Sequence, residues 1–245
     1  MEAAYAITTD GLTKKFGDFI ATNNITFQVK KGEIFGFLGA NGAGKTTAMR
    51  MLCGLLKPSS GKATVAGYDV YTQTESIKLN IGYMSQRFSL YEDLTVSENI
   101  RFYGGIYGLT RSAIKTATAE LLAKLALEKE AKSLVGSLPL GWKQKLSFSI
   151  AIIHNPAIVF LDEPTGGVDP ITRRQFWDLI YEAAHAGVTV FVTTHYMDEA
   201  EYCDRVSIMV DGKIKALDTP AALKTTFGAA TMNDVFLKLA REANQ

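Results

Sequence analysis

Runs of apolar residues divide the chain into a series of short strands. Apolar stretches bounded by glycine or by lysine-rich turns predict strands near the N-terminus over residues 5–12, 20–29 and 33–38. Farther along, the same pattern predicts strands over residues 62–65, 157–161, 188–193, 206–210 and 213–216. The segment 157–161 is apolar throughout, which is typical of a parallel strand that is buried on both faces.

Apolar residues spaced three and four positions apart predict the helices. They cover residues 46–55, 141–153, 173–184 and 197–203, together with a helical block from residue 97 to about residue 127. This block separates two sets of strands, as an inserted helical subdomain would. A chain of 245 residues has room for one large α/β domain with such an insertion. We expect a single domain with a core over residues 1–86 and 156–220, a helical subdomain over 87–155 and a helical tail over 221–245.

Composition narrows the range of partners before any motif is considered. Lys and Arg number 26, and Asp and Glu number 25. Proteins that bind mainly nucleic acid usually carry a basic excess, because phosphate neutralisation supplies most of their non-specific affinity. No segment approaches the roughly 18 uncharged apolar residues that a membrane-spanning helix needs. Cys53 and Cys203 lie among apolar residues without a CxxC pair, which is typical of reduced cytosolic thiols. We expect a soluble chain that acts on a membrane only through partner chains.

The clearest chemical motif follows the strand predicted over residues 33–38. Residues 39–46 have the pattern Gly-x-x-x-x-Gly-Lys-Thr, a P-loop, in the strand-to-helix context that such a loop requires. Glycines let backbone N–H groups turn toward phosphate oxygens, and the positive end of the following helix attracts them. The lysine can span the β- and γ-phosphates, and the threonine hydroxyl can bind Mg²⁺. The predicted nucleotide contacts are Gly39, Ala40, Asn41, Gly42, Ala43, Gly44, Lys45, Thr46 and Thr47.

A pair of acids follows the apolar strand at residues 158–161. In P-loop enzymes, a buried strand of this kind delivers the carboxylate that serves the metal ion. We expect Asp162 to hold Mg²⁺ through water and Glu163 to polarise the attacking water as a general base. The alternative is an acidic pair that only caps the next turn, and the P-loop upstream disfavours it.

The order of these and further motifs over residues 7–220 resembles that of an ATP-binding cassette (ABC) ATPase. Phe16 is similar in position to the aromatic ring that stacks on adenine in this family. Gln86 resembles the glutamine that senses Mg²⁺ and the attacking water. Asp169 resembles the aspartate of the loop that contacts a partner cassette, and His195 resembles the switch histidine that contacts the γ-phosphate. His195 also follows the strand predicted over 188–193, where α/β folds place ligand contacts.

The resemblance implies an α/β fold with a P-loop NTPase core, in which a mixed, mostly parallel sheet is flanked by helices. It also implies an N-terminal antiparallel β subdomain and an inserted α-helical subdomain. The cofactors that it implies are ATP and Mg²⁺. Catalysis is assigned to Lys45, Gln86, Glu163 and His195. Mg²⁺ binding is assigned to Thr46, Gln86 and Asp162.

One motif departs from the family pattern. The signature that contacts ATP across the cassette dimer is usually Leu-Ser-Gly-Gly-Gln, whereas residues 138–142 are Leu-Pro-Leu-Gly-Trp. The proline removes a hydroxyl and a backbone N–H, and Leu140 replaces a glycine that allows close approach. Either turnover is slowed, or the trans contacts are rebuilt; we favour the second because Glu163 and His195 are retained. Contacts in trans are assigned to Leu138, Pro139, Leu140, Gly141 and Asp169.

The function implied by the resemblance is ATP hydrolysis coupled to transport. Two cassettes would close around ATP and move a permease on a separate chain, docked near residues 86–96, at the cytoplasmic face of a bacterial inner or plasma membrane. Residues 165–170 and 233–237 resemble those of exporters that move drugs, lipids or polysaccharides. The alternative is a non-transport ABC ATPase acting on nucleic acid or the ribosome. The even charge balance and the lack of a second cassette, a charged linker or a long coiled coil disfavour it.

Overall fold

The computed structural model describes residues 5–86 and 90–242. An antiparallel sheet forms the N-terminal part of the protein. The strand order in this sheet is β2-β1-β4-β5. Its strands are β1 (Tyr5–Phe16), β2 (Phe19–Lys30), β4 (Ser60–Val65) and β5 (Tyr68–Asp69). β1 and β2 extend beyond their predicted bounds because their polar ends also pair through the backbone, as far as Phe16 opposite Phe19. Gly17, with φ +58°, lies in the tight turn that closes this hairpin.

A six-stranded sheet forms the centre of the molecule, in the order β10-β9-β3-β8-β7-β6. Its strands are β3 (Ile34–Leu38), β6 (Ile81–Met84), β7 (Ile158–Asp162), β8 (Thr189–Thr194), β9 (Arg205–Val210) and β10 (Lys213–Asp218). β9 and β10 are antiparallel, and the other neighbours are parallel. Every residue of β3, β7 and β8 is buried, as the continuous apolar pattern predicts. The two sheets confirm the expected α/β fold class.

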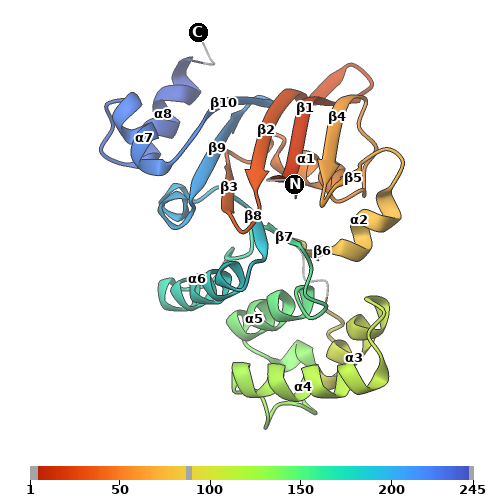
Figure 1. Cartoon of the computed structure of the whole chain (residues 1–245). Helices are drawn as coiled ribbons and strands as arrows, with labels where there is room; N and C mark the ends of the chain where they lie inside the picture. The colour runs from red at the N-terminus through yellow and green to blue at the C-terminus, as the bar shows by residue number, and fades with distance from the viewer. Residues whose placement is uncertain (1–4, 87–89, 243–245) are drawn as a thin grey trace.

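Successive side chains of the central strands enter two different hydrophobic cores, because neighbouring residues of a strand point to opposite faces. Phe160 and Phe191 face the core formed with the antiparallel sheet and α1 (Lys45–Leu52). Val159 and Val190 face a second core, formed with a layer of helices. These helices are α6 (Pro170–His185), α7 (Pro220–Thr226) and α8 (Met232–Glu242). In Figure 1, α7 and α8 lie on the opposite side of the molecule from β5.

Helices inserted between β6 and β7 form a lobe with its own hydrophobic core, seen at the bottom of Figure 1. They are α3 (Val96–Ile106), α4 (Arg111–Leu125) and α5 (Leu140–Ala151), with the short 3₁₀ helix η1 (Val135–Ser137) before α5. Val96, Leu121 and Leu146 bring the three longer helices together in this core. A full capping box starts α3, because Thr95 and Glu98 each accept a hydrogen bond from the other's backbone N–H. A helical insertion between two sets of strands is therefore present.

Local elements differ from the prediction in several places, and the strands β5 and β6 were not predicted. Residues 197–203 do not form an α-helix but the short 3₁₀ helix η2 (Met197–Tyr202), whose turns close by bonds such as Cys203 N–H to Ala200 O. α1 ends at Leu52 rather than at residue 55, because Gly54 adopts the left-handed φ of +68°. The helix α2 (Thr74–Asn80) was not predicted, since Ile77 is its single buried residue and leaves no apolar repeat.

Two further features of the described residues concern membrane-spanning helices and thiols. Within residues 5–86 and 90–242, no helix is both long enough and apolar enough to cross a membrane. Cys53 and Cys203 are buried thiols that form no disulfide. Burial raises the pKa of both thiols, so each stays protonated and shielded from oxidants.

The contact between β6 and α5 is a point where the fold tolerates no added atom. A Cβ on Gly82 would overlap the carbonyl oxygen of Ala151, at the end of α5. We expect Gly82→Ala to lower the free energy of unfolding by about 1–3 kcal/mol. Gly105→Ala is the control, because Gly105 is exposed in α3 with no atom near the added Cβ, and alanine there should raise stability by about 0.5–1 kcal/mol. Urea unfolding measures the free energy of unfolding of both variants. Equal values for the two would contradict a close contact between Gly82 and Ala151.

Candidate active site

The loop between β3 and α1 is shaped by close backbone contacts. A Cβ on Gly39 would overlap the carbonyl oxygen of Met209, and a Cβ on Gly44 would overlap that of Ala21. Gly44 also adopts φ +102° and directly precedes Lys45, the first residue of α1. The glycines are therefore needed for packing as well as for phosphate approach. The amino end of α1 supplies positive potential at the mouth of the loop.

Lys45 is nearly buried in this loop, with 4% of its surface exposed. Its Nζ atom donates to the carbonyl oxygens of Gly39 (2.8 Å) and Ala40 (3.1 Å) and lies 3.5 Å from Glu163 Oε1. Burial lowers the pKa of Lys45, and the negative charge of Glu163 opposes that shift. The loop thus holds the amine at the place where a P-loop lysine contacts phosphate.

Asp162 ends the buried strand β7 and turns its carboxylate toward the loop. Its Oδ1 atom accepts hydrogen bonds from the hydroxyls of Thr193 (2.6 Å) and Thr46 (3.2 Å). Burial raises the pKa of Asp162, and the two hydroxyl donors act against this rise. The Thr46 hydroxyl, the Asp162 carboxylate and the Gln86 amide oxygen are hard oxygen donors. The donor set that the sequence predicts therefore has the chemistry that Mg²⁺ requires.

Glu163 joins the other side chains assigned to catalysis. Its Oε2 atom accepts a hydrogen bond from Gln86 Nε2 (2.8 Å) and lies 3.0 Å from His195 Nδ1, while Oε1 faces Lys45. Its backbone adopts φ +50°, which is uncommon for a residue other than glycine. The Glu163 N–H donates to both the carbonyl and the hydroxyl oxygen of Thr193, each at 3.1 Å, which holds this conformation. The structure therefore brings the other three side chains assigned to catalysis to the Glu163 carboxylate.

The P-loop opens into a cavity of about 380 Å³. Its lining residues are Phe19, Ala21, Asn41, Gly42, Gly44, Lys45, Thr46, Thr47, Gln86 and Glu163. Phe16, the ring predicted to stack on adenine, is half exposed and is not among them. Phe19 pairs with Phe16 across the hairpin and is more exposed, at 64%. The sequence analysis missed Phe19, although the turn at Gly17 was a signal that could have placed the two rings together.

The residues assigned to contacts in trans lie apart from this cavity. They are Leu138, Pro139, Leu140, Gly141 and Asp169, and none of them lines it. The first four lead into α5, which lies so close to α6 that a Cβ on Gly141 would overlap the Thr172 side chain. Asp169 caps α6, because its Oδ1 atom accepts the backbone N–H groups of Ile171 and Thr172, each at 3.0 Å. Capping accounts for this aspartate within the chain, and its role in trans stays a prediction.

A buried acid that the sequence analysis overlooked connects the loop after Glu163 to the segment after His195. Glu199 is fully buried and accepts a hydrogen bond from the hydroxyl of Thr165. Arg173 Nε lies 3.6 Å from Glu199 Oε1, and its guanidinium lies 4.3 Å from the ring centroid of Tyr196. The sequence around Glu199 carries no signal for this role, because its partners are distant along the chain.

The sheet order, the inserted lobe and the P-loop site together define a cassette-type P-loop nucleotide-binding protein. Over residues 22–166, the sequence matches the family described as ABC transporter. The chain belongs to this family.

Several curated relatives are similar over most of this chain. The probable multidrug ABC transporter ATP-binding protein YbhF of Escherichia coli (strain K12) is 48% identical, over 93% of this chain and 40% of that protein. This chain thus spans about 40% of the length of that relative. The linearmycin resistance ATP-binding protein LnrL of Bacillus subtilis (strain 168) is 37% identical, over 92% of this chain and 73% of that protein. The Nod factor export ATP-binding protein I of Rhizobium sp. (strain N33) is 39% identical, over 89% of this chain and 72% of that protein.

Solved structures share the fold over nearly the whole chain. An ATP-binding subunit of an ABC transporter superposes with a TM-score of 0.86 at 27% identity, covering 96% of this chain and 99% of that one. A second structure is that of a cassette solved as a dimer in a post-hydrolysis state, bound to ADP and Pi. It has a TM-score of 0.78 at 24% identity and covers 87% of this chain and 98% of that one. At that identity, the second likeness concerns the fold alone.

The buried bond between Thr165 and Glu199 predicts a stability effect. In Thr165→Val, the carboxylate loses its hydroxyl donor while it stays buried, so we expect the free energy of unfolding to fall by about 1–3 kcal/mol. The matched control is Thr116→Val, an exposed site on α4, which should change stability by less than about 0.5 kcal/mol. Thermal or urea unfolding of both variants makes the comparison. A Thr165→Val protein as stable as the control would show that Glu199 does not depend on this bond.

Proposed function

We propose that this chain hydrolyses ATP to drive export through a transmembrane permease on a separate polypeptide, acting as one of a pair of cassettes. The observation that supports it most directly is the Glu163 carboxylate, which Gln86 and His195 contact and which faces Lys45. A carboxylate positioned in this way beside a phosphate-binding loop suits the removal of a proton from water.

In the proposed mechanism, each side chain at the cavity has a separate task. Lys45 exchanges its bonds to the Gly39 and Ala40 carbonyl oxygens for bonds to phosphate oxygens when ATP enters. Glu163 accepts a proton from the water that attacks the γ-phosphorus. Gln86 and His195 orient that carboxylate, and from beside it they would contact the water or the γ-phosphate. Catalysis then depends mainly on positioning and charge, as it does in phosphoryl transfer generally.

Mg²⁺ is the metal that this site would use. Thr46, Asp162 and Gln86 would hold it, directly or through water. The ion would neutralise charge on the β- and γ-phosphates. The hydroxyl of Thr46 donates a hydrogen bond to Asp162 Oδ1, which keeps both oxygen donors side by side.

The second half of each ATP site would come from a partner cassette. Leu140 is 39% exposed at the start of α5, and Ile171 is 72% exposed at the start of α6. We propose that this surface, with Asp169 and Gly141, faces the partner's nucleotide. The amino end of α5 offers positive potential to the γ-phosphate, in place of the serine hydroxyl that the usual signature provides.

The export direction and the location rest on analogy with the relatives, whose names mention multidrug transport, linearmycin resistance and Nod factor export. We propose that the chain binds its permease at the cytoplasmic face of a bacterial inner or plasma membrane, near residues 86–96. Residues 87–89 of that stretch lie outside the described residues. Next to them, Tyr91 and Phe102 are exposed and lie edge to face, with ring centroids 5.0 Å apart. Such rings suit a protein interface.

Glu163→Gln tests the assignment of the general base. The amide cannot take a proton but keeps the shape of the side chain, so we expect the ATPase rate to fall by a factor of about 10²–10⁴. ATP affinity should stay close to that of the wild type, and an ATP-dependent dimer should accumulate in size-exclusion chromatography. Glu128→Gln, at an exposed site in the lobe, is the matched control and should hydrolyse ATP at the wild-type rate. An unchanged rate in Glu163→Gln would mean that another group is the base.

Purification from native membranes tests the proposed partner. We expect the chain to be recovered with an integral membrane protein, identified by mass spectrometry, and to be released from the membrane when that protein is deleted. Recovery with ribosomes or DNA instead would support the non-transport ABC ATPases and contradict export. The strain that carries Glu163→Gln is a useful comparison, because binding to the permease does not require hydrolysis.

A further inference from the structure

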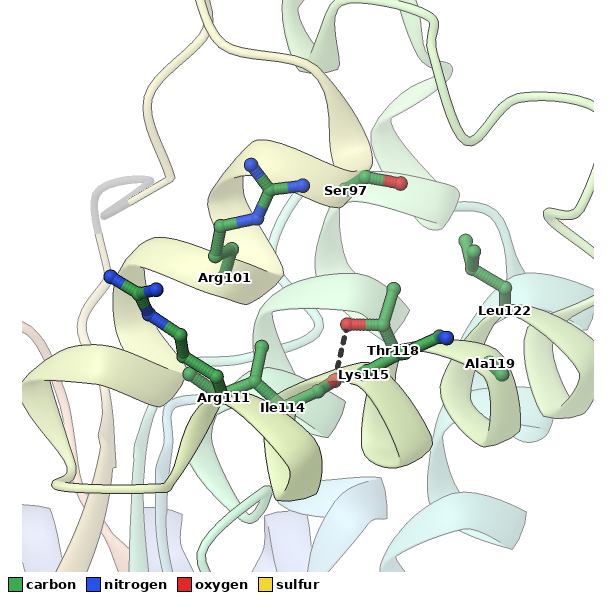
Figure 2. Close-up of a pocket in the computed structure, with 8 residues that line it drawn as sticks. All are labelled: Ser97, Arg101, Arg111, Ile114, Lys115, Thr118, Ala119 and Leu122. Carbon is green, nitrogen blue, oxygen red and sulfur yellow. Dashed lines mark hydrogen bonds between the residues drawn. The ribbon is translucent and has the colours of Figure 1, made fainter.

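A cavity of about 690 Å³ lies between α3 and α4, outside the nucleotide site (Figure 2). The two helices come close where a Cβ on Gly104 would lie 3.0 Å from Ile114 Cγ1. In Figure 2, Ser97 and Arg101 on α3 lie above a row of side chains from α4. A volume of this size is within the range of roughly 300–1,000 Å³ that is typical of small-molecule sites.

One face of α4 forms an apolar floor in this cavity. The lining positions 111, 114, 115, 118, 119 and 122 follow the helical repeat, so they share one face. Ile114, Ala119 and Leu122 supply hydrocarbon surface there. The hydroxyl of Thr118 donates to Ile114 O at 2.7 Å, the dashed line in Figure 2, so its hydrogen is used within the helix. The floor therefore favours an apolar group.

Three cations lie at the edge of the same cavity. They are Arg101 from α3, and Arg111 and Lys115 from α4, all exposed. Among residues 5–86 and 90–242, none of the three has an ion pair or a hydrogen bond from its side chain. Glu98, the acid nearest to Arg101 along α3, accepts hydrogen bonds from the backbone and the hydroxyl of Thr95, and the charge of Arg101 adds to the fall in its pKa that these bonds cause. Three cations around a low-dielectric floor attract an anion.

We infer that this cavity binds an anionic amphiphile, that is, a phosphate or carboxylate head group that carries a hydrocarbon chain. The cations receive the head group, and the α4 face receives the chain. Inorganic phosphate leaves the apolar floor uncovered, and a neutral hydrocarbon places no negative charge beside the three cations. Among the described residues that line the cavity, none is an aromatic ring that could stack on a nucleotide base. This inference is independent of the proposed export function.

Titration of the whole chain with octyl phosphate, below its micelle concentration, tests the inference. Isothermal titration calorimetry should show saturable binding to one site per chain. Inorganic phosphate and octyl glucoside, which each carry only half of the chemistry, should bind at least about tenfold more weakly. Equal affinity for octyl phosphate and either of these probes would overturn the inference, as would the absence of octyl phosphate binding.

A matched pair of variants locates the site. Ala119→Glu places a carboxylate on the cavity floor, whereas Ala123→Glu places it four residues on, at an exposed position of α4 that does not line the cavity. We expect Ala119→Glu to weaken octyl phosphate binding by about tenfold or more through charge repulsion, and Ala123→Glu to leave it unchanged. ATP affinity of both variants serves as the control for folding. Equal loss in the two variants would overturn the assignment to this cavity.

A second pair tests the cations at constant net charge. The double variant Arg101→Gln, Lys115→Gln should bind octyl phosphate at least about tenfold more weakly than the double variant Lys129→Gln, Lys132→Gln, which changes exposed lysines elsewhere in the lobe.

Sedimentation with phosphatidic acid vesicles, compared with phosphatidylcholine vesicles, shows whether the ligand is held in a membrane. If the wild type binds phosphatidic acid vesicles and the Arg101→Gln, Lys115→Gln variant does not, the ligand is a membrane lipid. If the wild type binds octyl phosphate but neither kind of vesicle, the ligand is a soluble amphiphile. Binding of an acidic peptide but not of octyl phosphate would overturn the inference.

Discussion

The burial of opposite charges at the carboxyl edge of the central sheet constrains much of the remaining structure. Lys45 and Asp162 have 4% and 2% of their surface exposed, and ionised groups in such surroundings are costly unless they are paired and hydrogen-bonded. The compensation comes from other strands and loops. Asp162 stands opposite Thr193 in the register of β7 and β8, and this hydroxyl is its closest donor. A shift of register by one residue would move the Thr193 hydroxyl away from the Asp162 carboxylate.

The conformation of Glu163 follows from the same pairing. The chain must leave β7 through a left-handed turn to direct the carboxylate at the P-loop, and Thr193 stabilises that turn with both of its oxygen atoms. Beyond the turn, Thr165 binds Glu199 in the segment that follows β8. The strand β8 and the residues after it therefore set the position of the proposed base, its histidine partner and the loop that follows the base.

The helical lobe contacts this site through two glutamines. Gln86 follows β6, at the entrance to the lobe, and donates to Glu163. Gln144, in α5, donates to the carbonyl oxygen of Gly166, in the loop after the base, at 3.0 Å. Gly82 allows the end of α5 to lie directly against β6. A displacement of the lobe would therefore change the hydrogen bonds at the nucleotide site, which is a physical route by which a partner on the lobe could influence hydrolysis.

Several parts of this protein follow from local sequence. The P-loop is contiguous, and its glycines, lysine and threonine have roles that depend on neighbouring backbone, so residues 39–46 identify it. The buried strands β3 and β7 are uninterrupted apolar runs, which explains why their predicted positions agree with the structure. The family resemblance added Gln86 and His195, and the structure places both at Glu163. The prediction failed where periodicity was weak, as in α2, or where a single glycine ended a helix, as in α1.

The sequence by itself determined the class of fold, the nucleotide-binding loop and the acids beside it, because these depend on short segments with strong local preferences. Only the tertiary structure decided that Phe19 lines the cavity, that Glu199 holds the loop after the base, and that three cations of α3 and α4 share an apolar cavity. Each of these arises from contacts between segments that are distant or unpatterned along the chain. Strand register and helix packing create such contacts, and no single segment encodes them.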